Sequence, residues 1–150
     1  MTPWLLVALI VAMDQASKLA VRAWMHPSDS FPLLPRLLHL TYVQNTGMAF
    51  GLFRGYPYVF VALAVGVAVW IVRELRQGPQ QGWAMCSLAL VLGGAIGNLL
   101  DRVRLGYVVD FIDLRVWPVF NLADSAITIG VSILIWRSLF PAKAAGSSPS

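Results

Sequence analysis

Residues 119–139 read VFNLADSAITIGVSILIWRSL, and this stretch decides the fold class. It is apolar over a length that suffices to cross a bilayer, which takes about 20 residues in a helix. Its single acid, Asp124, lies near the start of the stretch. Because an ionisable side chain at the edge of a membrane span is costly, Asp124 is a candidate functional residue.

Three further apolar stretches have comparable lengths, Thr2–Trp24, Tyr56–Val72 and Trp83–Leu100. Hydrophobic residues make up 58% of the chain and charged residues 12%, about half the charged fraction of a soluble domain. The first stretch has no basic segment before it and no small-residue cleavage site, so we interpret it as a retained span. We therefore predict an all-α membrane protein with four transmembrane helices.

The long segment between the first two spans is rich in proline and contains Leu37–Val43, whose β-branched and aromatic residues predict a strand. We expect it to form a small β-like platform at the membrane surface. Residues 1–140 are then a single four-span domain. The tail, residues 141–150, is small and polar and is expected to be disordered.

Metal and nucleic acid binding are not expected. Cys86 is the only cysteine, and His26 and His39 have no partner at ligand spacing, so we predict neither a metal site nor a cofactor. The net charge is +4, but the Lys and Arg residues form no basic stripe with interleaved aromatics. They are expected to hold helix ends at lipid headgroups, which makes membrane lipids the expected partners.

The distribution of basic residues does not settle the orientation. Four spans put both termini on one side, together with Arg73, Arg76, Arg137 and Lys143. The other side carries Arg36, Arg54, Arg102, Arg104 and Arg115. A simple count of Lys and Arg would therefore reverse the topology, although several of the latter residues lie beside acids.

A second acid, Asp110, lies 14 residues before Asp124 in Val108–Ile112. An aspartyl hydrolase needs at least two acidic side chains that meet in its site. One of them is ionised and acts as the general base, and the other is protonated and acts as the general acid. The alternative is that each acid only caps a helix or pairs with an arginine. At Asp124 the cap would use Asn121 as N-cap and Asp124 as the third helical residue.

Two more groups of polar residues accompany the spans. Asp14 and Lys18 are four residues apart and share a helix face, which predicts a structural ion pair facing the bundle. Asn45 offers amide donors, and the neighbouring Gly47 lets backbone approach a ligand closely; an ordinary Asn-Thr-Gly turn is the alternative.

The third span ends in a glycine-rich, polar segment. Gly93 and Gly97 form a small-xxx-small pair suited to close helix contact. Asn98, Asp101 and Arg102 follow within about a turn, where Asp101 or Arg102 is placed to pair with Asp110 or with a substrate carbonyl; a solvated helix end is the alternative.

In the fourth span, polar residues recur on one helix face, which we expect to face the bundle interior. They are Asn121, Asp124, Ser125, Thr128 and Ser132.

Five motifs in this order resemble the lipoprotein signal peptidase (signal peptidase II) family over about 140 residues. They are Asp14–Lys18 (DQASK), Gln44–Phe50 (QNTGMAF), Gly93–Arg102 (GGAIGNLLDR), Val108–Phe111 (VVDF) and Phe120–Ser125 (FNLADS). The resemblance implies a catalytic dyad of Asp110 and Asp124, supported by residues that bind or orient the substrate. These are Asn45, Gly47, Asn98, Arg102 and Asn121.

The resemblance further implies cleavage of a prolipoprotein signal peptide just before a diacylglyceryl-modified cysteine. It implies a place in the bacterial inner membrane, with both termini in the cytoplasm, the β-like platform outside the cytoplasm and the site near the periplasmic face. Sensitivity to globomycin, the cyclic peptide that inhibits this family, is also implied. We expect a monomer.

Two other function classes are alternatives to a peptidase. In a small transporter, Asp14 and Lys18 would form a proton relay, but no repeat relates the two halves of the chain. A non-catalytic assembly subunit built on the Gly93 and Gly97 face gives no reason for two acids beside Asn121 and Arg102.

Overall fold

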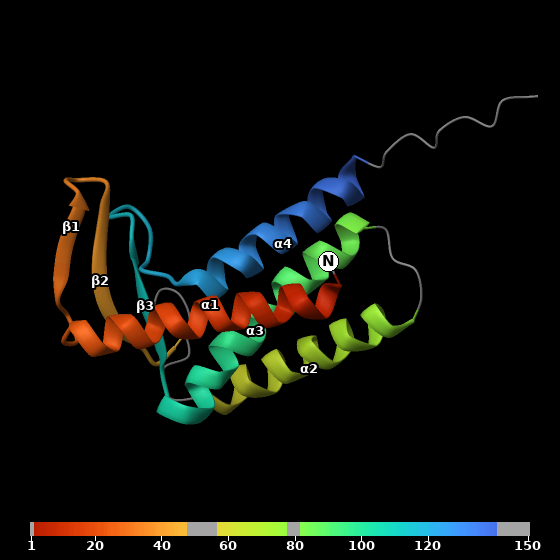
Figure 1. Ribbon diagram of the computed structural model, residues 1–150, viewed down its shortest axis with the longest axis horizontal. Coiled ribbons are helices and arrows are strands. Elements are labelled where there is room, and N and C mark those ends of the chain that lie inside the picture. Colours follow the sequence, from red (N-terminus) through yellow and green to blue (C-terminus); the bar gives the residue numbers. More distant parts are fainter. Residues whose placement is uncertain (1, 48–56, 78–81, 141–150) are drawn as a thin grey trace, which may run out of the picture.

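The computed structural model describes residues 2–47, 57–77 and 82–140 (Figure 1). The expected disordered tail and the Met48–Phe50 end of the second motif lie outside the described residues. The chain forms, in order, α1 (Pro3–Trp24), β1 (Ser30–Leu34), β2 (Leu38–Asn45), α2 (Pro57–Arg76), α3 (Gly82–Leu105), β3 (Val108–Asp113) and α4 (Leu122–Leu139).

Helix α3 is the centre of the bundle and contacts α1, α2 and α4 (Figure 1). Its glycines make this possible. A Cβ on Gly93 would lie 2.8 Å from Ile10 Cβ, and one on Gly97 would lie 2.5 Å from Asp14 Oδ2. Both glycines therefore face α1 at close range, which confirms the close helix contact predicted from the Gly93 and Gly97 pair.

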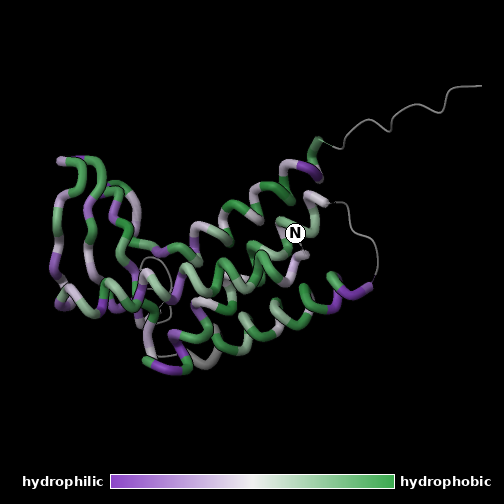
Figure 2. The backbone as a smooth tube through the Cα atoms, in the orientation of Figure 1, coloured by the Kyte–Doolittle hydropathy of each residue, from purple (hydrophilic) through white to green (hydrophobic). Residues whose placement is uncertain are grey.

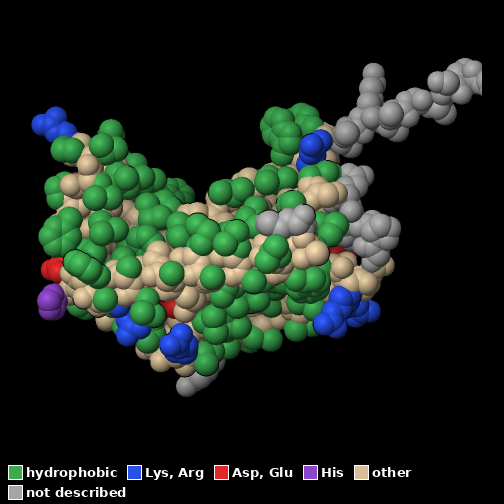
Figure 3. All heavy atoms as spheres, in the orientation of Figure 1, with side chains coloured by type: hydrophobic (Ala, Val, Ile, Leu, Met, Phe, Trp, Pro, Cys, Tyr) green, Lys and Arg blue, Asp and Glu red, His purple; other side chains and the backbone are tan. Residues whose placement is uncertain are grey.

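The outside of the bundle is apolar. Figure 2 shows hydrophobic helices with hydrophilic residues concentrated toward their ends, and Figure 3 shows Lys and Arg near the two ends of the molecule on this face. Within the described residues, three helices, α1, α3 and α4, are long and apolar enough to cross a membrane. Helix α2, the counterpart of the expected second span, is not among those three, so the count of four spans stays a prediction.

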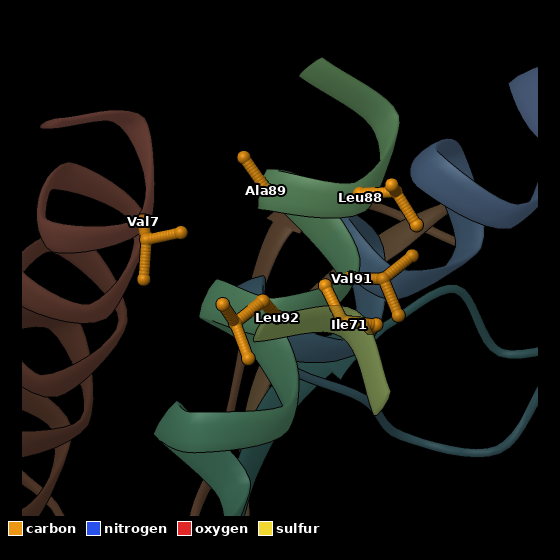
Figure 4. Packing of buried hydrophobic residues seen from close by; sticks show 6 residues of the cluster. All are labelled: Val7, Ile71, Leu88, Ala89, Val91 and Leu92. Atoms are coloured by element: carbon orange, nitrogen blue, oxygen red, sulfur yellow. The ribbon is translucent and has the colours of Figure 1, made fainter. Parts of the chain in front are cut away.

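Two apolar clusters hold the elements together. One joins Val7 of α1 and Ile71 of α2 to the α3 side chains Leu88, Ala89, Val91 and Leu92 (Figure 4). The other joins the end of α1 to the sheet through Val21, Met25, Tyr42, Val109 and Phe111. The sheet is therefore fixed to one end of the helices (Figure 1).

The sheet has three antiparallel strands in the order β1-β2-β3. The strand expected at Leu37–Val43 is confirmed as β2. The sequence reasoning assigned no strand to Val108–Ile112, which is β3; five of the six residues of this strand are buried, so it lacks the alternating pattern of a strand with one solvated face.

The ends of two helices differ from expectation. Helix α3 runs to Leu105 instead of ending at Leu100, so Asn98 and Asp101 are buried within the helix and are not a solvated end. Helix α4 starts at Leu122, not Val119, because Phe120 is held in a β-bridge to Ile112 by backbone bonds of 2.7 and 3.0 Å.

Candidate active site

Asp110 on β3 and Asp124 in the first turn of α4 line the same cavity of about 240 Å³. Asn45, Gly47, Asn98 and Arg102 line it too, with the segment Trp117–Phe120 on one side. The fold thus gathers residues from β2, α3, β3 and α4 at the junction of the sheet and the helices (Figure 1). Two acids that lie 14 residues apart in the sequence therefore line one cavity.

Asp124 takes part in a capping box. Asn121 Oδ1 accepts a hydrogen bond from the Asp124 backbone N–H at 2.9 Å, and Asp124 Oδ2 accepts one from the Asn121 N–H at 3.3 Å. The helix-capping interpretation of Asp124 is therefore correct. It accounts for only one carboxylate oxygen, because Oδ1 accepts from Asn98 Nδ2 at 2.7 Å.

The side-chain amide of Asn121 joins the two acid-bearing segments. Its Nδ2 donates to Asp110 Oδ1 at 2.6 Å, to Asn98 Oδ1 at 3.1 Å and to the Val109 carbonyl at 3.3 Å. Asn121 is fully buried. One residue therefore caps α4 and holds the carboxylate of β3.

The other oxygen of Asp110 is held from β2. Asn45 Nδ2 donates to Asp110 Oδ2 at 2.8 Å, and the Gly47 N–H donates to Asn45 Oδ1 at 3.0 Å. The second bond is the local turn that the sequence allowed, and it orients the Asn45 amide toward the acid. The turn and the contact with the acid occur together.

Burial sets the protonation of Asp110, whose side chain is almost inaccessible to solvent. Burial raises the pKa of Asp110 to about 7. The hydrogen bond from Asn45 lowers this pKa in part, and the neighbouring Asp124 carboxylate raises it further. Near neutral pH this carboxyl therefore carries a proton for a substantial fraction of the time.

Behind the cavity lies a buried ion cluster of Asp14, Lys18 and Asp101. The Lys18 ammonium lies 2.9 Å from Asp14 Oδ2 and 3.0 Å from Asp101 Oδ2, and all three residues are 3% exposed or less. The predicted pair of Asp14 and Lys18 is thus present, but the sequence reasoning missed its second carboxylate. Of the two residues considered as a partner for Asp110 or a substrate carbonyl, Asp101 is engaged by Lys18, and Arg102 lines the cavity with Asp110.

The ion cluster is bonded to the backbone beside each candidate acid. Asp14 Oδ1 accepts from the Ala123 N–H at 3.0 Å, and Asp101 Oδ2 accepts from the Val109 N–H at 3.0 Å. Gln15 completes it by donating to Asp101 Oδ1 at 3.0 Å. Gln15 was not singled out from the sequence, although its place beside Asp14 in the first motif was the available signal.

Arg102 lies at the cavity wall on α3. Its guanidinium donates to the Asn98 carbonyl at 3.3 Å and lines the cavity with both acids. A cation at this place is suited to a carbonyl oxygen that gains negative charge.

A second, mostly apolar cavity of about 380 Å³ adjoins the first. Trp117, Phe120 and Asp124 line both cavities, and Leu114, Ser125, Thr128 and Ile129 line the second one alone. The prediction that the polar face of the fourth span points into the bundle is wrong for Thr128 and Ser132, which are exposed. That face of α4 instead borders this open cavity beside Asp124.

Asp113 lies on the same strand as Asp110 but does not line the cavity. Its carboxylate is bonded to Thr41 Oγ1 at 2.9 Å and to Arg115 at 2.8 and 3.1 Å.

Over residues 2–47, 57–77 and 82–140, no three His, Cys, Asp or Glu side chains are grouped to hold a metal ion.

Known proteins resemble this chain over nearly its whole length. The family profile described as signal peptidase (SPase) II matches residues 6–140. The lipoprotein signal peptidase of Moorella thermoacetica is 52% identical over 98% of this chain and 99% of its own length. That of Halothermothrix orenii is 44% identical over 88% and 91%.

The fold is also shared with solved structures. One bacterial membrane enzyme, solved by the in meso method, superposes with a TM-score of 0.90 and 31% identity, covering 98% of this chain and 94% of that one. A second has a TM-score of 0.84 and 32% identity, over 93% and 94%. By sequence and by fold, the chain belongs to the signal peptidase II family of lipoprotein signal peptidases, which are membrane proteases.

Proposed function

We propose that this protein is an aspartyl endopeptidase that removes the signal peptide from diacylglyceryl-modified prolipoproteins, cutting just before the lipid-modified cysteine. The observation that carries the proposal is the arrangement of Asp110 and Asp124, which line one cavity and each accept a hydrogen bond from a buried asparagine amide, that of Asn121 and that of Asn98 respectively. Membership of a peptidase family favours this reading over the transporter and the assembly subunit.

The two carboxyl groups divide acid and base chemistry between them. Asp110 is protonated for a substantial fraction of the time near neutral pH, because burial raises its pKa to about 7. Ionised Asp124 accepts a proton from a water molecule as the water oxygen attacks the scissile carbonyl carbon. Protonated Asp110 donates to the carbonyl oxygen, so the tetrahedral intermediate forms without free hydroxide.

The intermediate then collapses. The carbon–nitrogen bond breaks and the leaving nitrogen takes the proton held by Asp124. One hydroxyl of the intermediate returns its proton to the Asp110 carboxylate, so the signal peptide is released as a carboxylic acid and both aspartates regain their starting protonation states. Arg102 stabilises negative charge on the carbonyl oxygen or on a neighbouring peptide carbonyl. Asn45 and Asn121 orient the Asp110 carboxyl group, Asn98 orients that of Asp124, and Gly47 holds Asn45.

The substrate enters from the bilayer. The apolar cavity beside Asp124 adjoins the polar cavity that both acids line. A substrate whose signal helix or acyl chain occupies the apolar cavity therefore has its scissile peptide bond in the polar cavity. We place four spans in the bacterial inner membrane within one domain of residues 1–140, with both termini cytoplasmic and the site near the periplasmic face. The start of α1 and the end of α4 both lie at the end of the bundle away from the sheet (Figure 1), which supports this placement.

Purified protein in detergent tests the proposal with a diacylglyceryl-modified precursor and the same precursor without the lipid. Mass spectrometry of the products should find cleavage only of the modified precursor, at the bond preceding the modified cysteine. Cleavage elsewhere, or equal cleavage of both precursors, would contradict the assigned substrate.

A further inference from the structure

Lys18 is a buried cation that the dyad mechanism does not use. An ammonium group has three hydrogens to donate, and Lys18 Nζ has three acceptors. They are Asp14 Oδ2 at 2.9 Å, Asp101 Oδ2 at 3.0 Å and Asn98 Oδ1 at 2.9 Å. The two carboxylates are structural partners, but the third acceptor, Asn98, lines the cavity that holds both candidate acids.

Asn98 connects Lys18 to Asp124 through its two chemically different ends. Its oxygen accepts from Lys18, and its NH₂ group donates to Asp124 Oδ1 at 2.7 Å. Turning this amide over would set NH₂ against ammonium and oxygen against carboxylate. Both contacts would then be repulsive, and the Asp124 carboxylate would lose a donor.

Lys18 is the dominant donor to the Asn98 oxygen. The only other donor that contacts this oxygen among the bonds described above is Asn121 Nδ2, at 3.1 Å. Asn121 divides that group among three acceptors, of which Asp110 at 2.6 Å is the nearest. The charged, undivided bond from Lys18 is therefore the stronger constraint on the amide.

We propose that Lys18 is a positioning residue for catalysis, which acts through Asn98 by presenting the NH₂ end of that amide to Asp124. The inference rests on the proposed role of Asp124 as a catalytic base. A purely structural ion pair makes a different prediction, since its loss would lower stability, and activity would only follow the amount of folded protein.

A double-mutant cycle separates the two roles, using wild type, Lys18→Met, Asn98→Ala and the double variant. Turnover is measured per folded protein, with kcat and KM determined separately on the modified precursor, and thermal unfolding is measured in the same detergent. If Lys18 acts through Asn98, Lys18→Met lowers kcat by about 100-fold in wild type, the cost of a catalytic group misplaced by an ångström. In the Asn98→Ala background the same change should alter kcat by no more than about twofold.

The stability readout is expected to behave differently. Lys18→Met leaves Asp14 and Asp101 buried without their cation in either background, so it should lower the unfolding temperature whether or not Asn98 is present. An equal loss of kcat in both backgrounds, or a loss explained by the folded fraction alone, would overturn the positioning role.

A charge-matched variant covers the case in which Lys18→Met does not fold. Lys18→Met combined with Asp101→Asn removes one positive and one negative charge. Its effect on kcat is measured in wild type and in the Asn98→Ala background, as for Lys18→Met alone. Asp124→Asn serves as the reference throughout. If Asp124→Asn keeps normal turnover, the proposed function fails; if Asp124→Asn is inactive but the cycle shows no coupling, only the role of Lys18 fails.

Discussion

Asn121 donates its side-chain amide to Asp110 Oδ1 at 2.6 Å from the N-cap of the helix that carries Asp124. This single bond ties β3 to α4 directly. The backbone bridge between Phe120 and Ile112 is a second tie between β3 and the start of α4. The residue that begins the helix therefore also holds the carboxylate of the strand.

The first prediction concerns the two carboxylates. Asp110→Asn and Asp124→Asn should each lower kcat on the modified precursor by about 1000-fold or more, because neither amide can exchange a proton with water or with the carbonyl. The measurement is turnover of folded protein in detergent, with folding checked by thermal unfolding.

Asp113→Asn is the matched control for these variants. Asp113 lies on the same strand as Asp110 but is bonded to Thr41 and Arg115 outside the cavity, so its change should leave most of the turnover intact. Near-normal turnover of Asp110→Asn or Asp124→Asn would rule out the dyad mechanism.

The second prediction concerns pH. Because Asp110 acts as the acid and burial raises its pKa to about 7, kcat/KM should decline as pH rises through about 7. Rates measured from pH 5 to 9 on protein shown to remain folded at each pH test this. A rate that stays constant to pH 9 would contradict the assignment of Asp110 as the acid.

Stability should depend on the same group. A raised pKa means that Asp110 binds more protons in the folded state than in the unfolded state between pH 3.8 and about 7. Its contribution to the free energy of unfolding is therefore fully present below this window and is lost as pH rises through it. Asp110→Asn, which has no proton to lose, should show a flatter dependence of the unfolding temperature on pH over the same range.

The third prediction uses two glycines in helices. A Cβ on Gly97 would lie 2.5 Å from Asp14 Oδ2, so Gly97→Ala should displace the ion cluster and destabilise the protein by about 1–3 kcal/mol. Gly66 in α2 has nothing within 4 Å of the same position, so Gly66→Ala should not destabilise. Thermal unfolding compares the two variants; equal effects would show that Gly97 does not limit the approach of α1 and α3.

The fourth prediction is that activity does not require a metal ion. The proton-sharing mechanism needs no Lewis acid, so turnover should be unchanged after treatment with a strong chelator. Activity lost with the chelator and restored by one divalent cation would instead identify Asp110 and Asp124 as metal ligands.

The fifth prediction concerns globomycin. If a hydroxyl of this inhibitor lies between Asp110 and Asp124 and imitates the tetrahedral intermediate, the inhibitor should bind far more tightly than a fragment of the substrate. Its affinity should drop in Asp124→Ala and less in Arg102→Ala, as measured by titration in detergent. Equal affinity of wild type and Asp124→Ala would place the inhibitor away from the dyad.

Several features of the fold followed from the sequence because they depend on local composition. Apolar length alone indicates α1, α3 and α4, since a helix that crosses hydrocarbon must be apolar over about 20 residues. The spacing of Asp14 and Lys18 predicted their contact, because residues four apart share a helix face. The N-cap of α4 was likewise readable from Asn121 and Asp124.

The start of α4 shows where local reasoning stops. Val119 and Phe120 are as apolar as the helix that follows, so the sequence placed them in the span. The backbone of Phe120 instead pairs with Ile112 of β3. That non-local pairing keeps Phe120 out of the helix, whose start at Leu122 agrees with the N-cap at Asn121.

The sequence by itself therefore determined which residues carry charge or hydrogen-bonding groups within an apolar chain. It also indicated Asp110 and Asp124 as the candidate catalytic acids. The tertiary structure alone decided their partners: Asn45 on Asp110, Asn98 on Asp124, and Asp101 as the second carboxylate on Lys18. The physical reason is that a buried polar group must find a partner wherever packing brings one, and these partners come from elements far apart in the chain.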